Sequence, residues 1–327
     1  MKALGRHLGS LLALLGLGGA VLLFLQQDPA RVFALVRDAG VGLVLAGTFH
    51  LVPMVLNARA WQVLMPKASQ PSLPRMTEAV WIRESVNGLL PVARLGGELV
   101  SYRLLRRYGS RRAPAAAGLV VDMAIGLLSQ FTISLLGVLL LFSASQSFDL
   151  ALQLSLGLLA MVPVCAGFVL VQRTGVFAKT TRLLNKVAAG RLEGAIGTSD
   201  RIDRAIRVMY RRRPGIIACF FWQLAGWIAG AGELWLALRF LGHPIDVADA
   251  VALEAMIQAV SSVAFFVPGA LGVQEGAFLL VGGALGLDAP TALALATARR
   301  VRDVVVFFPG LLAWQAREGR AQAAAVS

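Results

Sequence analysis

The sequence predicts an all-α polytopic membrane protein with about six full spans and two re-entrant or broken helical hairpins in an inverted repeat. Hydrophobic residues make up 57% of the 327 residues and charged residues only 15%, and the mean hydropathy is +0.71. Apolar runs recur at the length of about 20 residues that a helix needs to cross a bilayer. Two segments rich in Pro and Gly, each with acidic residues, interrupt this pattern. We therefore expect one transmembrane domain over residues 1–327, without room for a soluble catalytic domain of ordinary size.

Six apolar runs account for the full spans. The first, residues 8–25, follows a basic N-terminus like a secretory signal, but it is long for one and no small-x-small cleavage site follows it, so we expect a retained helix. The other runs lie at 40–56, 115–142, 149–171 and 215–241, and a last span at 303–316 reaches back to Thr291. Gly226 and Gly230 have the small-xxx-small spacing that permits close packing of helices.

The distribution of charge predicts the orientation. Of the 31 Lys and Arg residues, 21 lie within 59–112 and 173–213, whereas the loops at 143–149 and 242–249 contain Asp and no Lys or Arg. Because Lys and Arg concentrate in cytoplasmic loops, we expect the N- and C-termini in the cytoplasm. A nucleic-acid partner is not expected, because the aromatic residues that would stack on bases lie in or beside apolar runs.

The connection at 173–213 is predicted to be a basic cytoplasmic segment on the inner leaflet. It has eleven basic residues against Glu193, Asp200 and Asp203, and its second half ends in Arg211-Arg212-Arg213, the charge order that a helix dipole favours. Two interpretations remain open here. The segment is either a solvated loop that only fixes topology or a specific site for anionic inner-leaflet lipids.

An internal similarity predicts the two broken hairpins, at 76–104 and 248–287. In 90–98 and in 267–275, a Pro and a Glu stand seven residues apart with Gly between them. Pro blocks the preceding helical turn and Gly permits unusual dihedrals, so each segment should break a helix at membrane depth. The residues expected to shape the breaks are Pro91, Gly96, Gly97, Pro268, Gly269 and Gly272.

The two hairpins are expected to enter the membrane from opposite sides. Three full spans separate them, and an odd number inverts the second copy, so the hairpin tips would meet near the midplane as in inverted-repeat transporters. A polar backbone at that depth is tolerated only beside a buried or watery cavity, which the Glu beyond each break would face. The alternative is a chance Pro-x6-Glu match in a Gly-rich membrane protein.

Charged residues at membrane depth give the candidate site. Each costs roughly 2.5–3.5 kcal/mol on insertion scales, so several of them require partners or a function. The cavity or substrate-binding candidates are Glu84, Arg94, Glu98, Asp122, Glu254, Glu275, Arg299 and Arg302. Other readings stay open, since 299–303 could be an interfacial loop, Asp122 or Glu233 a carboxylate that only packs helices, and His50 a packed, hydrogen-bonded histidine.

Several chemistries lack their residues in this sequence. There are three histidines and two cysteines, Cys165 and Cys219, both inside apolar runs, so no metal-site signature is present. No phosphate-binding Gly-rich Lys loop or dinucleotide fingerprint occurs either. We expect no cofactor and no metal, although Glu98 and Glu275 could form a carboxylate pair for acid–base work on a lipid head group.

The sequence resembles the flippase-like membrane domain of lysylphosphatidylglycerol synthases. The resemblance rests on the span pattern, on residues Glu84 to Pro91 with Gly96-Gly97-Glu98, and on residues Pro268 to Gly276. The resemblance covers nearly the whole chain. Around Trp81 to Glu98 and at Val120-Val121-Asp122 it is most similar to the stand-alone subfamily associated with hopanoid biosynthesis. The resemblance implies lipid translocation across a bacterial inner membrane. Full synthases continue into a soluble aminoacyl-transferase domain whereas this sequence ends at Ser327, so we do not expect lipid lysylation.

Three functions remain as hypotheses. The first is a flippase-like translocase, without enzymatic activity, that moves a polar or anionic lipid across the membrane. Hopanoid-related lipids are one candidate class of substrate. Glu98 and Glu275 would line its cavity, with Arg94, Arg299 and Arg302 as counter-charges. The second is a membrane enzyme that acts on a polyprenyl or hopanoid lipid head group. The third is a non-catalytic scaffold that binds lipid-synthesis enzymes through 173–213.

Overall fold

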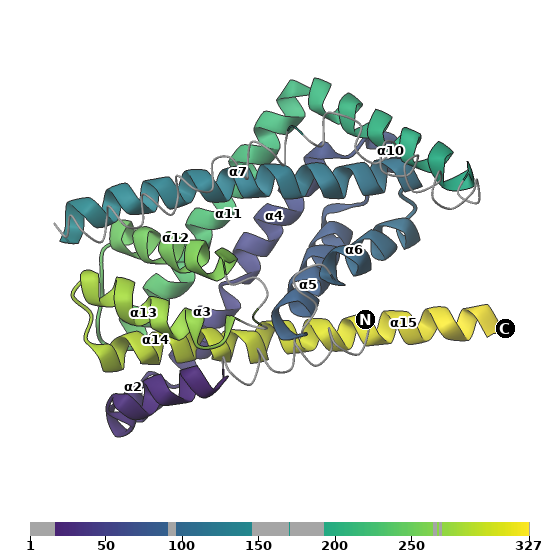
Figure 1. The fold of residues 1–327 in the computed structure, drawn as a ribbon. Coiled ribbons are helices and arrows are strands. Elements are labelled where there is room, and N and C mark those ends of the chain that lie inside the picture. The colour runs from purple at the N-terminus through teal and green to yellow at the C-terminus, as the bar shows by residue number, and fades with distance from the viewer. Residues whose placement is uncertain are drawn as a thin grey trace.

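The computed structural model describes residues 17–90, 96–145, 170, 193–263, 267 and 270–326, and within these ranges the chain forms helices and no strand (Figure 1). The first described helices are α1 (Leu17–Gln26) and α2 (Pro29–Ala39), which meet at an angle of 98°. The Asp28 carboxylate accepts a hydrogen bond from the Arg31 amide and so caps α2, with Pro29 in its first turn. The predicted first span thus lies only partly within the described residues, and the chain bends sharply after it.

In the part of the chain that the structure describes, three helical segments are long and apolar enough to cross a membrane. They are Val41–Leu64, Arg112–Ser143 and Arg213–Phe240. The first combines α3 (Val41–Thr48) with α4 (Leu51–Leu64), the second lies in α7 (Arg112–Ser145), and the third is α11 (Arg213–Phe240). A fourth candidate arises if α1 and α2 are counted as one broken span. The multi-pass, all-helical class is therefore confirmed within the described residues, and the total of about six spans is not.

Two other predicted spans are not among these three candidate membrane spans. The run at 149–171 lies outside the described residues, apart from position 170. The last predicted span belongs to a longer helical stretch that comprises α14 (Ala289–Arg302), the π-helical segment η3 (Asp303–Phe307) and α15 (Phe308–Val326). Charged residues at the end of α14 lower the hydropathy of this stretch, so its composition alone does not identify it as a membrane span.

Each segment with Pro and Gly consists of two helices that pack on each other. In the first, α5 (Leu73–Leu89) contacts α6 (Gly96–Arg107), and in the second, α12 (Val247–Val263) contacts α13 (Val273–Ala284). Figure 1 shows the two pairs toward opposite ends of the molecule, with α14 and α15 running alongside both. Pro91, Arg94, Pro268 and Gly269 lie outside the described residues.

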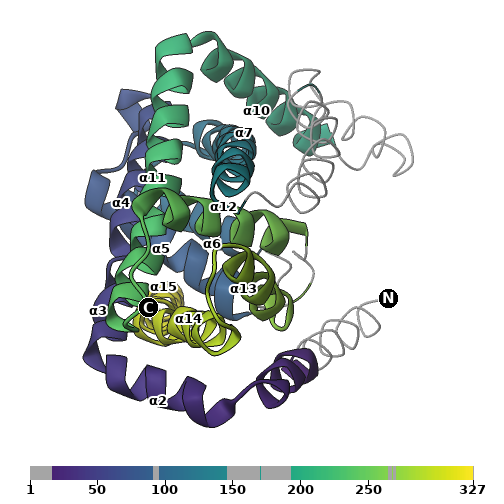
Figure 2. The same cartoon turned by 90° about the vertical axis from the view of Figure 1, so that its left-hand side faces the viewer.

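The helix α11 connects the parts of the bundle, because it packs along α4, α7, α12 and α3 (Figure 2). Glycines make these approaches close. A Cβ at Gly226 would lie 2.5 Å from the Asn57 side chain on α4, and one at Gly230 would lie 3.5 Å from the Glu254 side chain on α12. The helix α10 (Glu193–Arg211) lies across α7 at the end of the bundle that also holds the short 3-10 helix η1 (Lys67–Ser69).

Candidate functional site

The last turn of α14 brings three arginines into the middle of the bundle. The Asp288 carboxylate caps the start of this helix by accepting a hydrogen bond from the Thr291 amide at 3.1 Å. Successive residues on a helix point about 100° apart, so Arg299, Arg300 and Arg302 reach different neighbours. Arg299 is 1% exposed and Arg302 is 7% exposed, so both guanidinium groups require partners within the protein.

Arg299 finds its partners on two other helices. It pairs directly with the carboxylate of Glu254 on α12, and its Nε lies 3.8 Å from Glu233 Oε1 on α11. Gln258, one turn along α12, donates a hydrogen bond to the other oxygen of Glu254 at 2.9 Å. The three helices α11, α12 and α14 are therefore joined by one buried set of charges.

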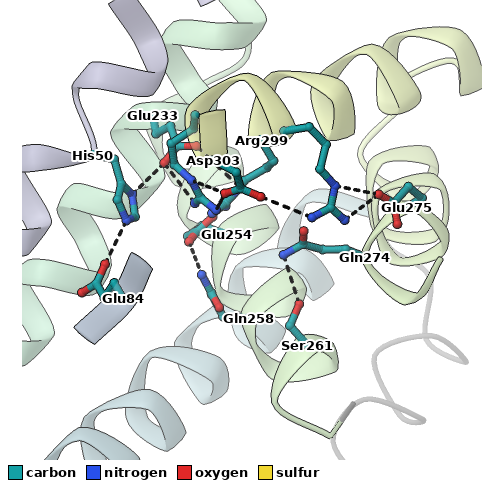
Figure 3. Close-up of polar contacts among 12 residues, drawn as sticks. His50, Glu84, Glu233, Glu254, Gln258, Ser261, Gln274, Glu275, Arg299 and Asp303 are labelled. Atoms are coloured by element: carbon teal, nitrogen blue, oxygen red, sulfur yellow. Dashed lines mark hydrogen bonds and ion pairs between the residues drawn. The ribbon is translucent and has the colours of Figure 1, made fainter. Parts of the chain in front are cut away.

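Glu233 extends this set toward the first helix pair (Figure 3). Its Oε2 lies 3.5 Å from Arg302 Nη1 and 2.8 Å from Nδ1 of His50, which stands just before α4. The other ring nitrogen of His50, Nε2, lies 3.3 Å from Glu84 Oε2 on α5. Polar contacts thus run without interruption from α12 to α5, that is, from one helix pair to the other.

Glu275 holds the beginning of α13. Its Oε2 accepts a hydrogen bond from the Gly272 amide at 2.7 Å, and its Oε1 accepts from Arg300 at 2.7 and 3.2 Å. Gly272 has a φ of +75°, a conformation that a residue with a side chain rarely adopts. Arg300 also pairs with Asp303 at 3.4 Å, and Asp303 pairs with Arg302 at 2.6 Å, which connects Glu275 to the central set.

A second cluster of charges joins α5, α6 and α7. Nη1 of Arg83 donates to Asp122 Oδ2 at 3.0 Å and lies 3.9 Å from Glu98 Oε2, and Gln223 on α11 donates to the other oxygen of Asp122 at 2.9 Å. The guanidinium of Arg83 also stacks over the Trp61 ring at 5.2 Å, a favourable cation–π distance. Asp122 is buried, at 2% exposed, and Arg83 and Glu98 are partly buried.

The π-helical segment η3 carries Asp303 of the central set and packs on α5, the helix that bears Arg83. A π-helical turn displaces backbone carbonyls from their usual partners, and such turns often occur at functional sites. Here the Trp81 indole donates to the carbonyl of Val306 at 2.7 Å. The Phe307 ring packs edge-on against His50 and under the guanidinium of Arg302, 4.8 Å from the ring centre.

The predicted residues fall into two groups in space. Glu84, Glu254, Arg299 and Arg302 meet in the central set, which continues to Glu275 through Arg300, whereas Glu98 and Asp122 meet at Arg83. Among the described residues, the arginines that contact Glu98 and Glu275 are Arg83 and Arg300. Arg299 and Arg302, which we named for this role, pair with other carboxylates, and Arg94 lies outside the described residues. Within the described residues, no three His, Cys, Asp or Glu side chains are placed to hold a metal ion.

Sequence reasoning missed the amides of the site. Gln258 and Gln223 orient buried carboxylates, and the Asn87 side chain accepts a hydrogen bond from the Gly97 amide at 2.8 Å. One signal was available, because Gln258 stands four residues after Glu254 and such positions share a helix face. His50, for which a packed, hydrogen-bonded histidine was one expectation, forms its hydrogen bonds with carboxylates of two helices, and the sequence did not indicate these partners.

Membrane-spanning helices that bury a network of charges between them define an integral membrane protein. The chain belongs to the family described as Lysylphosphatidylglycerol synthase TM region, whose model matches residues 8–310. The resemblance seen in the sequence is thereby confirmed at the level of this family, which points to a membrane function related to lipids. Comparison with curated proteins and with solved structures gave no significant match.

Proposed function

We propose that this protein translocates the head group of a lipid across the bacterial inner membrane, between the helix pairs α5–α6 and α12–α13. The observation that carries this proposal is the chain of buried contacts from Glu254 through Arg299, Glu233 and His50 to Glu84. Charges at this depth are costly, and in membrane proteins they mark transport pathways. A structural scaffold would not require five ionisable side chains in one line, three of them buried and two partly buried.

The mechanism follows from the cost of moving a polar group through hydrocarbon. A head group without hydrogen bonds loses several kcal/mol on leaving water, whereas one that exchanges contacts with the network keeps its partners. The acyl chains can remain in the lipid, because the polar path lies between the helix pairs. In this mechanism Arg299 and Arg302 exchange Glu233 and Glu254 for the substrate and return to them after release.

Equivalent positions in the two halves support an inverted repeat. Asp122 and Arg299 each follow their Pro, at 91 and 268, by 31 residues. Asp122 pairs with α5, the first helix of its pair, and Arg299 pairs with α12, the first helix of the other pair. Glu98 and Glu275 each occupy the third position of the second helix. An ion pair thus joins this position to the first helix of the pair in both halves, with the charges exchanged and with partners that stand 8 and 14 residues before their Pro.

The charges at the two ends support an orientation with both termini in the cytoplasm. Arg317 on α15 pairs with Glu78 on α5, and Arg107 on α6 pairs with Glu318, so the C-terminal helix ends beside α5 and the basic end of α6. The loop between α11 and α12 has Asp246 and no Lys or Arg, and Asp288 before α14 pairs with Arg31. Labelling of single cysteines placed at 72 and 244 in intact cells tests this orientation, since only position 244 should react with an impermeant reagent.

The charge balance of the two clusters favours a particular head group. Among the described residues of these clusters, carboxylates outnumber arginines by seven to four, and each of the four arginines has a carboxylate partner. Spare carboxylate oxygens accept hydrogen bonds, so a head group rich in hydroxyl or amino donors fits better than a purely anionic one. The hydroxylated head groups of hopanoid lipids meet this requirement, in agreement with the resemblance to the hopanoid-associated subfamily.

A leaflet assay in proteoliposomes tests the proposal. Fluorescent analogues of a phosphatidylglycerol, an aminated phospholipid and a polyhydroxylated hopanoid are incorporated, and movement between leaflets is followed by chemical quenching of the outer leaflet. We expect wild-type protein to move the analogues with donor-rich head groups. Glu84→Gln, Glu254→Gln, Glu98→Ala and Glu275→Ala should each reduce the rate by about tenfold or more, since each removes a charged contact.

Glu78→Gln is the matched control for Glu84→Gln. Glu78 lies on the same helix but forms a partly exposed ion pair with Arg317 at its end, so the substitution should leave the rate within about twofold of wild type. Failure of the wild-type protein to move any of the three analogues would contradict the proposal, as would normal transport by Glu254→Gln. Product formed by purified protein in detergent would instead support the enzyme hypothesis.

A further inference from the structure

The helix α10 presents a hydrophobic face to the bundle and a basic face away from it. Ile206 and Met209 are buried and pack with residues of α4, α7 and α11. Val208, on another face, is 53% exposed although it is apolar, and Arg204 and Arg201 stand one and two turns before it. A helix with this arrangement is typical of a segment that lies in the membrane interface.

A groove of about 520 Å³ runs between α10, the loop before η1 and the beginning of α7. Its floor is apolar and comes from three separate parts of the chain, namely Pro66, Pro114 and the side chains of Val208 and Met209. Two of these residues are prolines, which hold the floor in a rigid shape. An apolar groove of this size accommodates a segment of an acyl chain rather than a hydrated ion.

The rim of the groove is strongly basic. Lys67, Arg201, Arg204 and Arg212 line it, and none of the described lining residues is a carboxylate. Arg212 is also fixed to the bundle, because its Nη1 lies 3.5 Å from the carbonyl of Leu64. Four cations around an apolar floor complement a molecule with an anionic head and an apolar tail.

We propose that this groove binds an anionic phospholipid from the leaflet that meets the basic end of the bundle. Its phosphate lies between Arg201, Arg204 and Lys67, and one acyl chain covers Val208 and the two prolines. The site shares no residue with the buried charge network, so it does not depend on which lipid the protein translocates. A nucleic acid would need aromatic side chains for stacking in place of an aliphatic floor.

Occupancy of the groove has a consequence for the bundle. The C-terminal end of α10 leads through Arg212 directly into α11, the helix that bears Glu233, and α10 also packs on α7, which bears Asp122. A lipid that bridges α10, Pro114 of α7 and the loop before η1 therefore stabilises the junction of these elements. Anionic lipid should accordingly raise the melting temperature of the purified protein, whereas zwitterionic lipid should not.

Lipid binding to the full-length protein tests the site. The protein is held in a neutral detergent and titrated with short-chain phosphatidylglycerol or phosphatidylcholine, and binding is counted by native mass spectrometry at two salt concentrations. We expect selective, salt-sensitive binding of phosphatidylglycerol. Since each cation near the head group contributes about 1 kcal/mol, the double variant Arg201→Gln/Arg204→Gln should lower the affinity by about 30-fold.

Two further variants separate the groove from general basicity. Val208→Glu changes an exposed residue, so the fold should persist while the new carboxylate repels the phosphate and lowers the affinity by about tenfold. Arg103→Gln removes an exposed arginine of α6 and should bind as wild type does. The proposal would be overturned if the protein bound the two lipids equally, or if Arg103→Gln lost as much affinity as the groove variants. It would also be overturned if both groove variants bound phosphatidylglycerol as wild type does, or if glycerol phosphate, which has no acyl chains, competed as well as the lipid.

Discussion

The guanidinium of Arg299 contacts the carboxylate of Glu254 at the interface of α14 and α12, where the two residues are 1% and 4% exposed. Two further nitrogens of Arg299, Nε and Nη1, are buried without a hydrogen-bond partner among the described residues. A guanidinium with five donors and so few acceptors has capacity for an additional acceptor. This residue therefore unites a structural contact with the capacity to bind a substrate oxygen.

Removal of one partner of this pair should strongly destabilise the protein. Arg299→Gln leaves Glu254 buried without its cation, and such a change costs about 3–5 kcal/mol. We expect a large drop in the melting temperature, measured in detergent by tryptophan fluorescence together with size-exclusion chromatography.

The double variant Arg299→Gln/Glu254→Gln distinguishes stability from function. It removes both charges and keeps polar side chains of similar size, so much of the lost stability should return. Transport should remain absent, because the guanidinium has not been restored. If the double variant is no more stable than Arg299→Gln, the two residues do not act as a pair.

The close approach of α15 to α5 gives a second prediction. A Cβ at Gly310 would lie 2.8 Å from the Trp81 indole nitrogen and still closer to the Ser85 hydroxyl. Gly310→Ala should therefore separate these helices and cost about 1–3 kcal/mol through overpacking. The measurement is the melting temperature of the purified protein.

Gly319→Ala is the matched control on the same helix. A Cβ at this position meets nothing within 4 Å, so the substitution should stabilise the protein slightly, by up to about 1 kcal/mol, because Ala favours a helix. Opposite signs for the two glycines would confirm the contact. A neutral Gly310→Ala would show that α15 does not pack on α5 in this way.

The sequence revealed much of the fold because composition and periodicity depend on the local chain. Apolar length was enough to place α7 and α11, and Pro and Gly were enough to expect breaks near 91 and 268. It did not reveal the connection of α14 to α15 through a π-helical segment, because this turn depends on the tertiary contact between Trp81 and the Val306 carbonyl. The helix propensities of neighbouring residues do not depend on such a contact and therefore cannot predict it.

The candidate site was foreseeable in its members and not in its pairings. Insertion cost singled out Glu254 and Arg299 as charges that need partners. The choice of Arg83 for Glu98 and of Arg300 for Glu275 depends on the rotation of each helix about its axis. An error of one residue turns a side chain by about 100°, so pattern alone cannot decide among three adjacent arginines.

The cap of α14 gives a prediction about pH. The Asp288 carboxylate accepts a hydrogen bond from the Thr291 amide and lies 2.6 Å from Arg31. Asp288→Ala should lower stability by about 1 kcal/mol at neutral pH through loss of the cap. Asp288→Asn retains a capping oxygen and should lose less, which isolates the part due to the ion pair.

The direction of the pH effect follows from the pKa of Asp288. The hydrogen bond to Thr291, aided by Arg31, holds this pKa below its usual value of 3.8. A carboxylate with a lowered pKa stabilises the folded protein fully above the usual value and loses this effect as the pH falls through the folded value. The difference in melting temperature between wild type and Asp288→Ala should thus be constant at neutral pH and shrink below about pH 4. A difference that grows on acidification would contradict this role.

The position of His50 between two carboxylates gives the last prediction. Both ring nitrogens face carboxylate oxygens, at 2.8 Å in Glu233 and 3.3 Å in Glu84, so a histidine can donate to both only when each nitrogen bears a proton. A glutamine at this position could donate to one carboxylate and would turn its own oxygen toward the other. His50→Gln should therefore break the connection between α5 and α11 and slow lipid transport by about tenfold or more, while the protein remains folded.

His243→Gln, a change of a histidine in the loop between α11 and α12, is the control and should leave the rate of leaflet exchange unchanged. Normal transport by His50→Gln would show that the path through the two helix pairs does not use this histidine, and the chain of contacts from Glu254 to Glu84 would then be structural.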